Sequence, residues 1–204
     1  MNSFKKNIYS TATEDSCPDV TIGTQVWTSC NLNVDRYRNG DLIPEVTDPV
    51  AWTTLTTGAW CWHENNSANG PIYSKLYNWY AVNDPRGLAP VGYHIPSNTE
   101  WTTLSNYLGG LSSLGAAIKE TGLTHWSSPN TGATNSSGFT ALGGGWRSGG
   151  NGAFSILNRD GYWWSSTVFG VGNSYSRFVN YNTSGGYNVQ SYIKDGLSVR
   201  LIKD

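Results

Sequence analysis

The chain has 204 residues, a formal net charge of -1 and 13% charged side chains, about half the share usual in soluble proteins. This charge balance excludes the strongly basic surface that nucleic-acid-binding proteins need. No apolar run approaches the roughly twenty residues of a membrane span, which excludes membrane insertion. Ten Trp and twelve Tyr indicate aromatic side chains both in a core and at an interface.

Residues 1–19 are expected to form a polar N-terminal arm, and residues 20–204 a single domain. Lys5 and Lys6 are not followed by an apolar stretch, so no secretory signal peptide is visible. The cysteines are Cys17, Cys30 and Cys61. Their odd number argues against a full disulfide framework and leaves one bridge with one buried thiol open.

The first elements are expected to be strands and turns. Residues 20–32 predict a strand, a turn at Gly23 and a second strand around residues 26–27. Asn39-Gly40 is a strong signal for a tight turn. From residue 72 to residue 80, apolar side chains recur at spacings of three and four, which predicts one helix.

The clearest start signal for a helix lies at residues 97–109. Ser97 and Glu100 form a capping box, in which each side chain accepts a hydrogen bond from a free backbone N–H of the first turn. Apolar residues then line one face until Gly109 ends the helix. A further short helix is expected over residues 111–121.

The C-terminal half is expected to consist of strands and long loops. Short strand-like segments lie at residues 162–169, 175–181 and 187–193. Residues 196–204 alternate apolar and polar side chains, which predicts a half-buried strand. The fold class is therefore α+β, with helices in the N-terminal half and a loop-rich β C-terminal half.

The chain shows no catalytic constellation. None of His63, His94 and His125 has a nucleophile or carboxylate at a recognisable catalytic spacing, and His94 is expected to be a hydrogen-bonded structural residue. Cys61, His63 and Glu64 match no metal-site spacing, and the aspartates are too scattered for calcium. The sequence predicts no enzyme activity, no cofactor and no metal.

Long motifs resemble one known family along nearly the whole chain from residue 20 to residue 204. They include TIGTQVWTSCNL, KLYNWYAVNDPRGLAPVGYHIPSNTEWTTLSNYLGG, GFTALGGGWR, GYWWSST and GLSVRLIKD. These segments resemble the Fibrobacter succinogenes major paralogous domain family. The resemblance implies a C-type lectin-like fold of the formylglycine-generating-enzyme type. In some members it also implies a C-terminal target of a diversity-generating retroelement, in which Asn codons are replaced.

The resemblance places a variable ligand-binding region at about residues 146–193. Trp146, Trp163, Trp164 and Tyr181 can instead be core residues, an interpretation we favour for Trp163 and Trp164 because they match the family framework. The candidate ligand-binding residues are Ile156, Asn158, Arg159, Asp160, Tyr162, Val168, Phe169, Tyr175, Phe178, Asn180, Tyr187 and Tyr192. Their mixture of rigid aromatic and small polar side chains is typical of antibody binding loops.

The expected function is receptor binding by a hypervariable surface on a phage tail or a bacterial cell surface. The expected partner is a protein or glycan receptor on a target cell. Display in several copies, as a homotrimer or attached to a virion, would raise the avidity. The alternatives are a fixed-specificity carbohydrate-binding protein and a structural surface protein. A formylglycine-generating oxidase is disfavoured because no cysteine follows Cys61.

Overall fold

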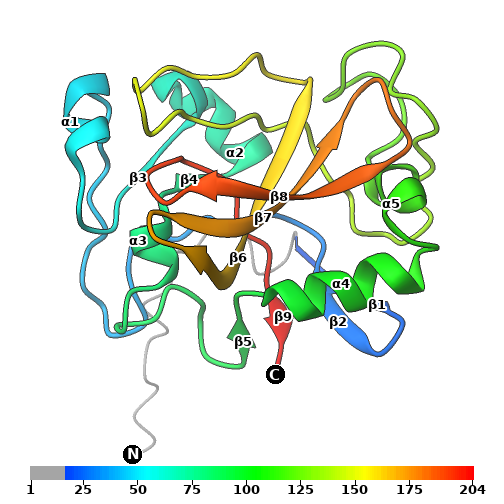
Figure 1. Ribbon diagram of the computed structural model, residues 1–204, viewed down its shortest axis with the longest axis horizontal. Helices are drawn as coiled ribbons and strands as arrows, with labels where there is room; N and C mark the ends of the chain where they lie inside the picture. Colours follow the sequence, from blue (N-terminus) through cyan, green and yellow to red (C-terminus); the bar gives the residue numbers. More distant parts are fainter. Residues whose placement is uncertain (1–16) are drawn as a thin grey trace, which may run out of the picture.

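The computed structural model describes residues 17–204, and Figure 1 shows the arrangement of their helices and strands. Residues 1–16 of the expected arm lie outside the described residues, whereas Asp19 already belongs to the first strand. The helices are α1 (Pro49–Thr54), α2 (Gly70–Tyr73), α3 (Trp79–Val82), α4 (Asn98–Tyr107) and α5 (Leu111–Ile118), with two short 3-10 turns, η1 (His63–Asn65) and η2 (Ser67–Asn69). The strands are β1 (Asp19–Ile22), β2 (Gln25–Thr28), β3 (Trp60–Cys61), β4 (Leu76–Tyr77), β5 (Tyr93–His94), β6 (Asp160–Gly170), β7 (Asn173–Asn180), β8 (Gly186–Tyr192) and β9 (Ile202–Lys203).

The mixed α+β class is confirmed, and so is the division between the two halves of the chain. The α-helices of the described chain all end before residue 119, and its three longest strands all begin after residue 159. Strands β6, β7 and β8 form one antiparallel sheet in chain order. The last strand, β9, lies between β2 and β5 in a second sheet, ordered β1-β2-β9-β5 (Figure 1).

Elements with strong local signals form as the sequence predicts. β1 and β2 pair around Gly23, whose φ of 64° favours glycine. The capping box of α4 is present, with the Ser97 N–H donating to the Glu100 carboxylate at 2.7 Å. Gly109, with a φ of 90°, follows the end of this helix. α5 ends at Ile118, three residues before the predicted end at residue 121.

The single helix predicted from residue 72 to residue 80 is wrong. Ser74 has a φ of 64°, which no helix accommodates, and it ends α2. The chain then forms β4, which pairs with β3, before Asn78 caps α3. The helical spacing arose because Tyr73 and Leu76 are both buried, each in a different local structure.

The prediction of a half-buried strand at residues 196–204 is also wrong, because most of this segment is buried on both sides. Leu197, Val199 and Leu201 are buried as expected, but Ser198 and Arg200 are equally buried on the other side. This segment runs between two parts of the molecule, where Leu197 N donates to Tyr77 O at 3.0 Å and Trp164 N donates to Ser198 O at 3.0 Å. Only Ile202 and Lys203 count as regular strand.

Two apolar clusters form most of the core, and neighbouring tryptophans of β6 belong to different clusters. Trp163 packs with Trp27, Trp101 and Phe139 in one cluster. Trp164 packs with the other cluster, which contains the residues of the C-terminal segment such as Leu197. β6 therefore joins the two halves of the core.

The cysteines pair in the arrangement that the sequence left open. Cys17 and Cys30 form a disulfide, and Cys61 is a buried free thiol. Burial raises the pKa of the Cys61 thiol to about 12. Within residues 17–204, no helix has the length and apolar content of a membrane span.

Candidate ligand-binding face

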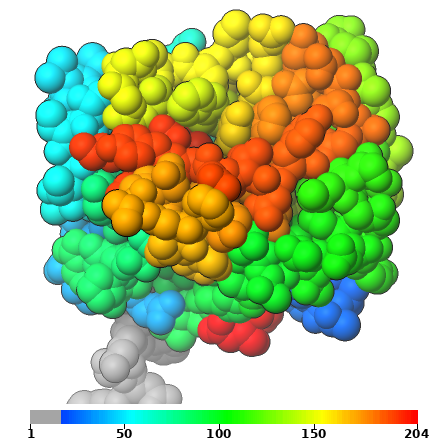
Figure 2. Space-filling view, in the orientation of Figure 1, coloured from blue at the N-terminus to red at the C-terminus, as the bar shows by residue number. Residues whose placement is uncertain are grey.

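The candidate residues lie on the sheet β6-β7-β8 and on the loop that leads into it. In Figure 2 the segments coloured yellow to red, which include this loop and these strands, gather on the face turned to the viewer. Each of the candidate side chains is at least partly exposed. The most exposed is Ile156 at 64%, followed by Val168, Phe169, Tyr187 and Tyr192.

The framework residues between these positions are buried, as the sequence predicts for Trp163 and Trp164. The indole of Trp163 donates to Asn31 Oδ1 at 2.8 Å, and that of Trp164 donates to Tyr77 O at 2.7 Å. Both are fully buried, whereas Trp146 and Tyr181 are only partly buried. The two indoles point to opposite sides of β6 and pack in different core clusters, so the sheet is fixed on both sides by residues that differ from those it exposes.

Three of the candidates form a continuous stack of rings across the sheet, which we call the aromatic row: Tyr162, Phe178 and Tyr187. These residues lie opposite one another on β6, β7 and β8. The ring centroids of Tyr162 and Phe178 are 4.5 Å apart at 21°, and those of Phe178 and Tyr187 are 5.4 Å apart at 27°. Trp146 adjoins the row, 6.1 Å from Tyr162.

Polar candidates adjoin the start of β6. The Asn180 amide donates to the Asp160 carboxylate, and Arg159 donates to the Tyr181 hydroxyl at 2.8 Å. Burial raises the pKa of Asp160, which makes its carboxylate easier to protonate. The start of β6 therefore presents partly exposed hydrogen-bonding side chains beside the aromatic row.

Asn158 has a structural role that the sequence reasoning did not assign. Its φ of 65° is in the left-handed region, where Asn is favoured over most residues. Its side-chain Oδ1 accepts a hydrogen bond from the Tyr73 hydroxyl, and its backbone N–H donates to Gly143 O at 2.8 Å. Asn158 therefore anchors the loop that enters β6.

A second group of candidates lies at the β6–β7 hairpin, away from the aromatic row. Phe169 and Tyr175 contact each other edge to face at 5.1 Å. Tyr175 is an odd number of residues from Phe178 along β7, so its side chain points to the opposite side of the sheet. Tyr192, opposite Asn173, is on that same side. The candidate residues thus form two groups.

Sequence reasoning missed Val171, at the tip of this hairpin. Its exposure is 103%, the highest among the large apolar residues of the described chain. Val171 and Gly172 join β6 to β7, and Val171 lies between two glycines, Gly170 and Gly172. The glycine-flanked position between two strands was the signal that would have found it.

Buried cations hold the sheet from behind, and sequence reasoning missed these as well. Lys119 Nζ donates to Thr131 O, Asn180 O and Thr183 O at 2.9 to 3.1 Å. Arg177 on β7 donates to Asn98 Oδ1 at 2.9 Å and to Asn188 Oδ1 at 2.7 Å. Asn98 begins α4 and Lys119 directly follows α5, so these contacts join both helices to β7, and through Asn188 to β8.

The histidines lie away from the aromatic row, in three separate environments. His63 is buried, and its Nε2 is 2.9 Å from Ser155 O. His94 is hydrogen-bonded to Asp204 at 2.7 Å and to Glu100 at 2.8 Å, as expected of a structural residue. His125 is 2.9 Å from Glu120. Among residues 17–204, no group of three His, Cys, Asp or Glu side chains is placed to hold a metal ion.

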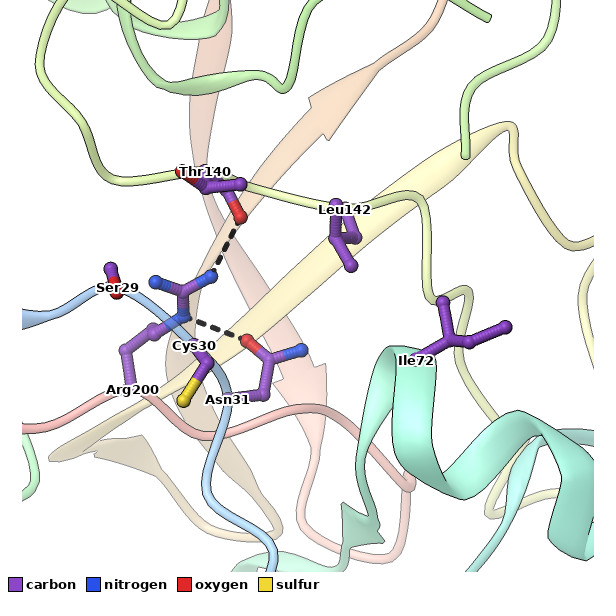
Figure 3. A pocket seen from close by; sticks show the side chains of 7 residues that line it. All are labelled: Ser29, Cys30, Asn31, Ile72, Thr140, Leu142 and Arg200. Carbon is purple, nitrogen blue, oxygen red and sulfur yellow. Dashed lines mark hydrogen bonds between the residues drawn. The ribbon is translucent and has the colours of Figure 1, made fainter. Parts of the chain in front are cut away.

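A cavity of about 210 Å³ lies apart from the candidate residues (Figure 3). Its lining consists of Ser29, Cys30, Asn31, Ile72, Thr140, Leu142 and Arg200. The Arg200 guanidinium donates to Asn31 Oδ1 at 2.8 Å and to Thr140 O at 2.9 Å. These bonds tie the C-terminal segment to two loops, so Arg200 acts as a structural brace.

One comparison with known proteins gives a match. The family model described as Fibrobacter succinogenes major domain matches residues 20–203. No curated protein and no solved structure matches the chain significantly. The matched region includes every candidate residue and every element from β2 to β9.

Proposed function

The chain belongs to the Fibrobacter succinogenes major domain family. On this basis we propose that the face formed by β6, β7 and β8 binds a receptor on another cell. The observation that carries the proposal is the separation of roles along single strands. On β6, Tyr162 is partly exposed in the aromatic row, while the adjacent Trp163 and Trp164 are fully buried. Tyr162 packs against the core cluster of Trp164, whereas Phe178 and Tyr187 belong to none of the core clusters of the described chain. The face can therefore change at Phe178 and Tyr187 without altering the core.

The proposed fold is C-type lectin-like, of the formylglycine-generating-enzyme type, and the proposed origin of the face is retroelement diversification. Loop-rich structure between α5 and β6 and a last strand paired near the N-terminal hairpin support this assignment. Ile156, Val168 and Phe178 are each reachable from an Asn codon by changes at adenines, and each is at least partly exposed.

Recognition would depend on shape, stacking and neutral hydrogen bonds. Large rings give contact area with few rotatable bonds, so a few of them, worth about 2 kcal/mol or more each, can dominate an interface. The partner is a protein or glycan receptor on a target cell. Display on a phage tail or a bacterial cell surface, as a homotrimer or another array, would multiply a moderate affinity.

The deciding experiment is deep sequencing of the gene's last third across its natural population. We expect substitutions to concentrate at Ile156, Val168, Phe169 and Phe178, while Trp163 stays constant. Substitutions spread evenly over exposed and buried positions would contradict diversification. They would leave a fixed-specificity carbohydrate-binding protein or a structural surface protein as the better account.

A further inference from the structure

The sheet β6-β7-β8 has one edge that is closed and one that is open. Along β6, Ser198 N donates to Tyr162 O at 3.2 Å and Trp164 N donates to Ser198 O, so the C-terminal segment covers that edge. Along β8, no strand of residues 17–204 pairs on the side away from β7. Figure 2 shows β8 as an orange-red band lying uncovered across the face.

The backbone groups on the open edge of β8 can be identified from the register. Ile193 N donates to Gly172 O at 3.0 Å, so this opposing pair is hydrogen-bonded. In an antiparallel ladder the bonded pairs alternate with unbonded ones, and the register from β7 to β8 is unbroken. The N–H and C=O groups of Asn188 and Gln190 therefore point away from β7, toward solvent.

The open stretch has definite ends. At one end Ser184 O accepts from Ala116 N of α5 at 2.7 Å, and at the other Tyr192 O accepts from Asp195 N at 2.7 Å. Between them β8 reads GYNVQSY, with neither a charged residue nor a proline. Native proteins usually protect an exposed edge with such residues, so this edge is suited to pairing with another strand.

From this geometry we infer that the partner adds an extended peptide segment to the β8 edge, bonded to the backbone of Asn188 and Gln190. This inference rests on the proposed binding face and names the chemistry of its ligand. In an added antiparallel strand, the residue opposite Tyr187 belongs to an unbonded pair, whose side chains approach most closely. An aromatic residue there would extend the aromatic row by one ring.

The arrangement also explains how a variable face keeps a constant mode of binding. Backbone hydrogen bonds to Asn188 and Gln190 do not depend on side chains, so they supply affinity for any extended segment. The side chains on the exposed face then select among segments. Because β8 itself carries no charged residue, we expect the preferred segment to be uncharged and to alternate aromatic with small polar residues.

The test uses a library of random linear peptides displayed on filamentous phage and selected on the full chain. Two variants are compared with the natural protein. Gln190→Pro removes one outward N–H without touching the ladder to β7, and Gln190→Ala removes the side chain but keeps that N–H. We expect the selected peptides to bind Gln190→Ala normally and to bind Gln190→Pro about tenfold more weakly.

A second measurement keeps the test valid if Gln190→Pro fails to fold. Bound peptide should slow hydrogen exchange at the amides of Asn188 and Gln190 in the natural protein, and N-methylation of alternate peptide amides should abolish binding. If the selected peptides bind both variants equally and protect neither amide, the edge inference is overturned.

The binding face itself is tested separately with Phe178→Ala. Loss of peptide or glycan-array binding in this variant, without any difference between the two Gln190 variants, retains the binding face and rejects the edge. If neither peptides nor a glycan array binds the natural protein, both the binding face and the edge are rejected.

Discussion

Buried Lys and Arg side chains stabilise this fold through hydrogen bonds, although charged residues are few in the sequence. Lys119 is fully buried with three carbonyl acceptors, and Arg177 and Arg200 are bonded to neutral groups in the same way. Burial lowers the pKa of Arg177 to about 10. A sequence shows such residues only as scattered charges, because their partners are backbone carbonyls and side-chain amides, most of them from distant segments.

Replacement of Lys119 by Met should strongly destabilise the protein. The change removes the donor of three hydrogen bonds and leaves the carbonyls of Thr131, Asn180 and Thr183 unsatisfied. We expect a loss of about 3 kcal/mol in the free energy of unfolding, measured by urea denaturation. The control Lys203→Met removes an exposed pair with Asp19 and a distant contact with the Tyr93 ring, and should cost less than about 1 kcal/mol.

His63 should make the stability depend on pH. Burial lowers its pKa below 6.5, and its Nδ1 has no hydrogen-bond partner within the described chain. Below pH 6.5 the unfolded chain therefore binds a proton that the folded protein resists, so stability should fall as the pH falls. This loss should be absent in His63→Gln, measured by urea denaturation between pH 7 and pH 5.

His94 has the opposite effect on the pH dependence of stability, so the contribution of His63 must be found by comparing the natural protein with a variant. Its hydrogen bonds to Asp204 and Glu100 raise its pKa, which adds stability at low pH that is lost as the pH rises. The difference between the natural protein and His63→Gln isolates His63. If the two proteins show the same pH dependence, the buried imidazole is not the cause.

Among the helices and strands, those specified by neighbouring residues were predicted correctly. Those that depend on contacts between distant segments were not. α4 follows from a capping box, an apolar face and a glycine, which all lie between Ser97 and Gly109. The failure from residue 72 to residue 80 has the opposite origin. There the pairing of β4 with β3 and the φ of Ser74 decide the structure, and both depend on distant contacts.

The capping box offers a test at this scale. Ser97→Ala leaves the Glu100 N–H without its acceptor, so we expect a loss of about 1 kcal/mol, seen as a lower urea midpoint. Thr103→Ala changes an exposed position of the same helix and should alter stability by less than about 0.5 kcal/mol. Equal effects of the two substitutions would argue that the cap contributes nothing.

The residues of the candidate site could be predicted, but not which of them contact one another or which side of the sheet they occupy. The resemblance gave the positions, and each is at least partly exposed. Strand register, which the sequence does not specify, puts Phe178 and Tyr187 in one stack and Tyr175 and Tyr192 on the other side. The role of Asn158 was also hidden, because its partner Tyr73 is 85 residues away.

At the scale of the whole molecule, the exposed and buried residues of one sheet should tolerate change very differently. Replacing Val168, Phe178 and Tyr187 together by Ser removes the ring stacks but leaves the core, so we expect a loss of about 2 kcal/mol. Trp164→Ala alone should cost about 3 to 5 kcal/mol. Calorimetry that ranks the triple variant below Trp164→Ala in stability would contradict this separation.

The position of β9 has a consequence for which mutations of the gene the fold can tolerate. The last strand pairs with β2 and β5, and Arg200 just before it binds carbonyls of Thr28 and Phe139. A growing chain cannot complete this sheet until Ile202 and Lys203 are made. A frameshift or stop codon upstream would delete that strand and leave an unfolded product for proteases. Only substitutions that preserve the reading frame therefore keep β9 and its pairing with β2 and β5.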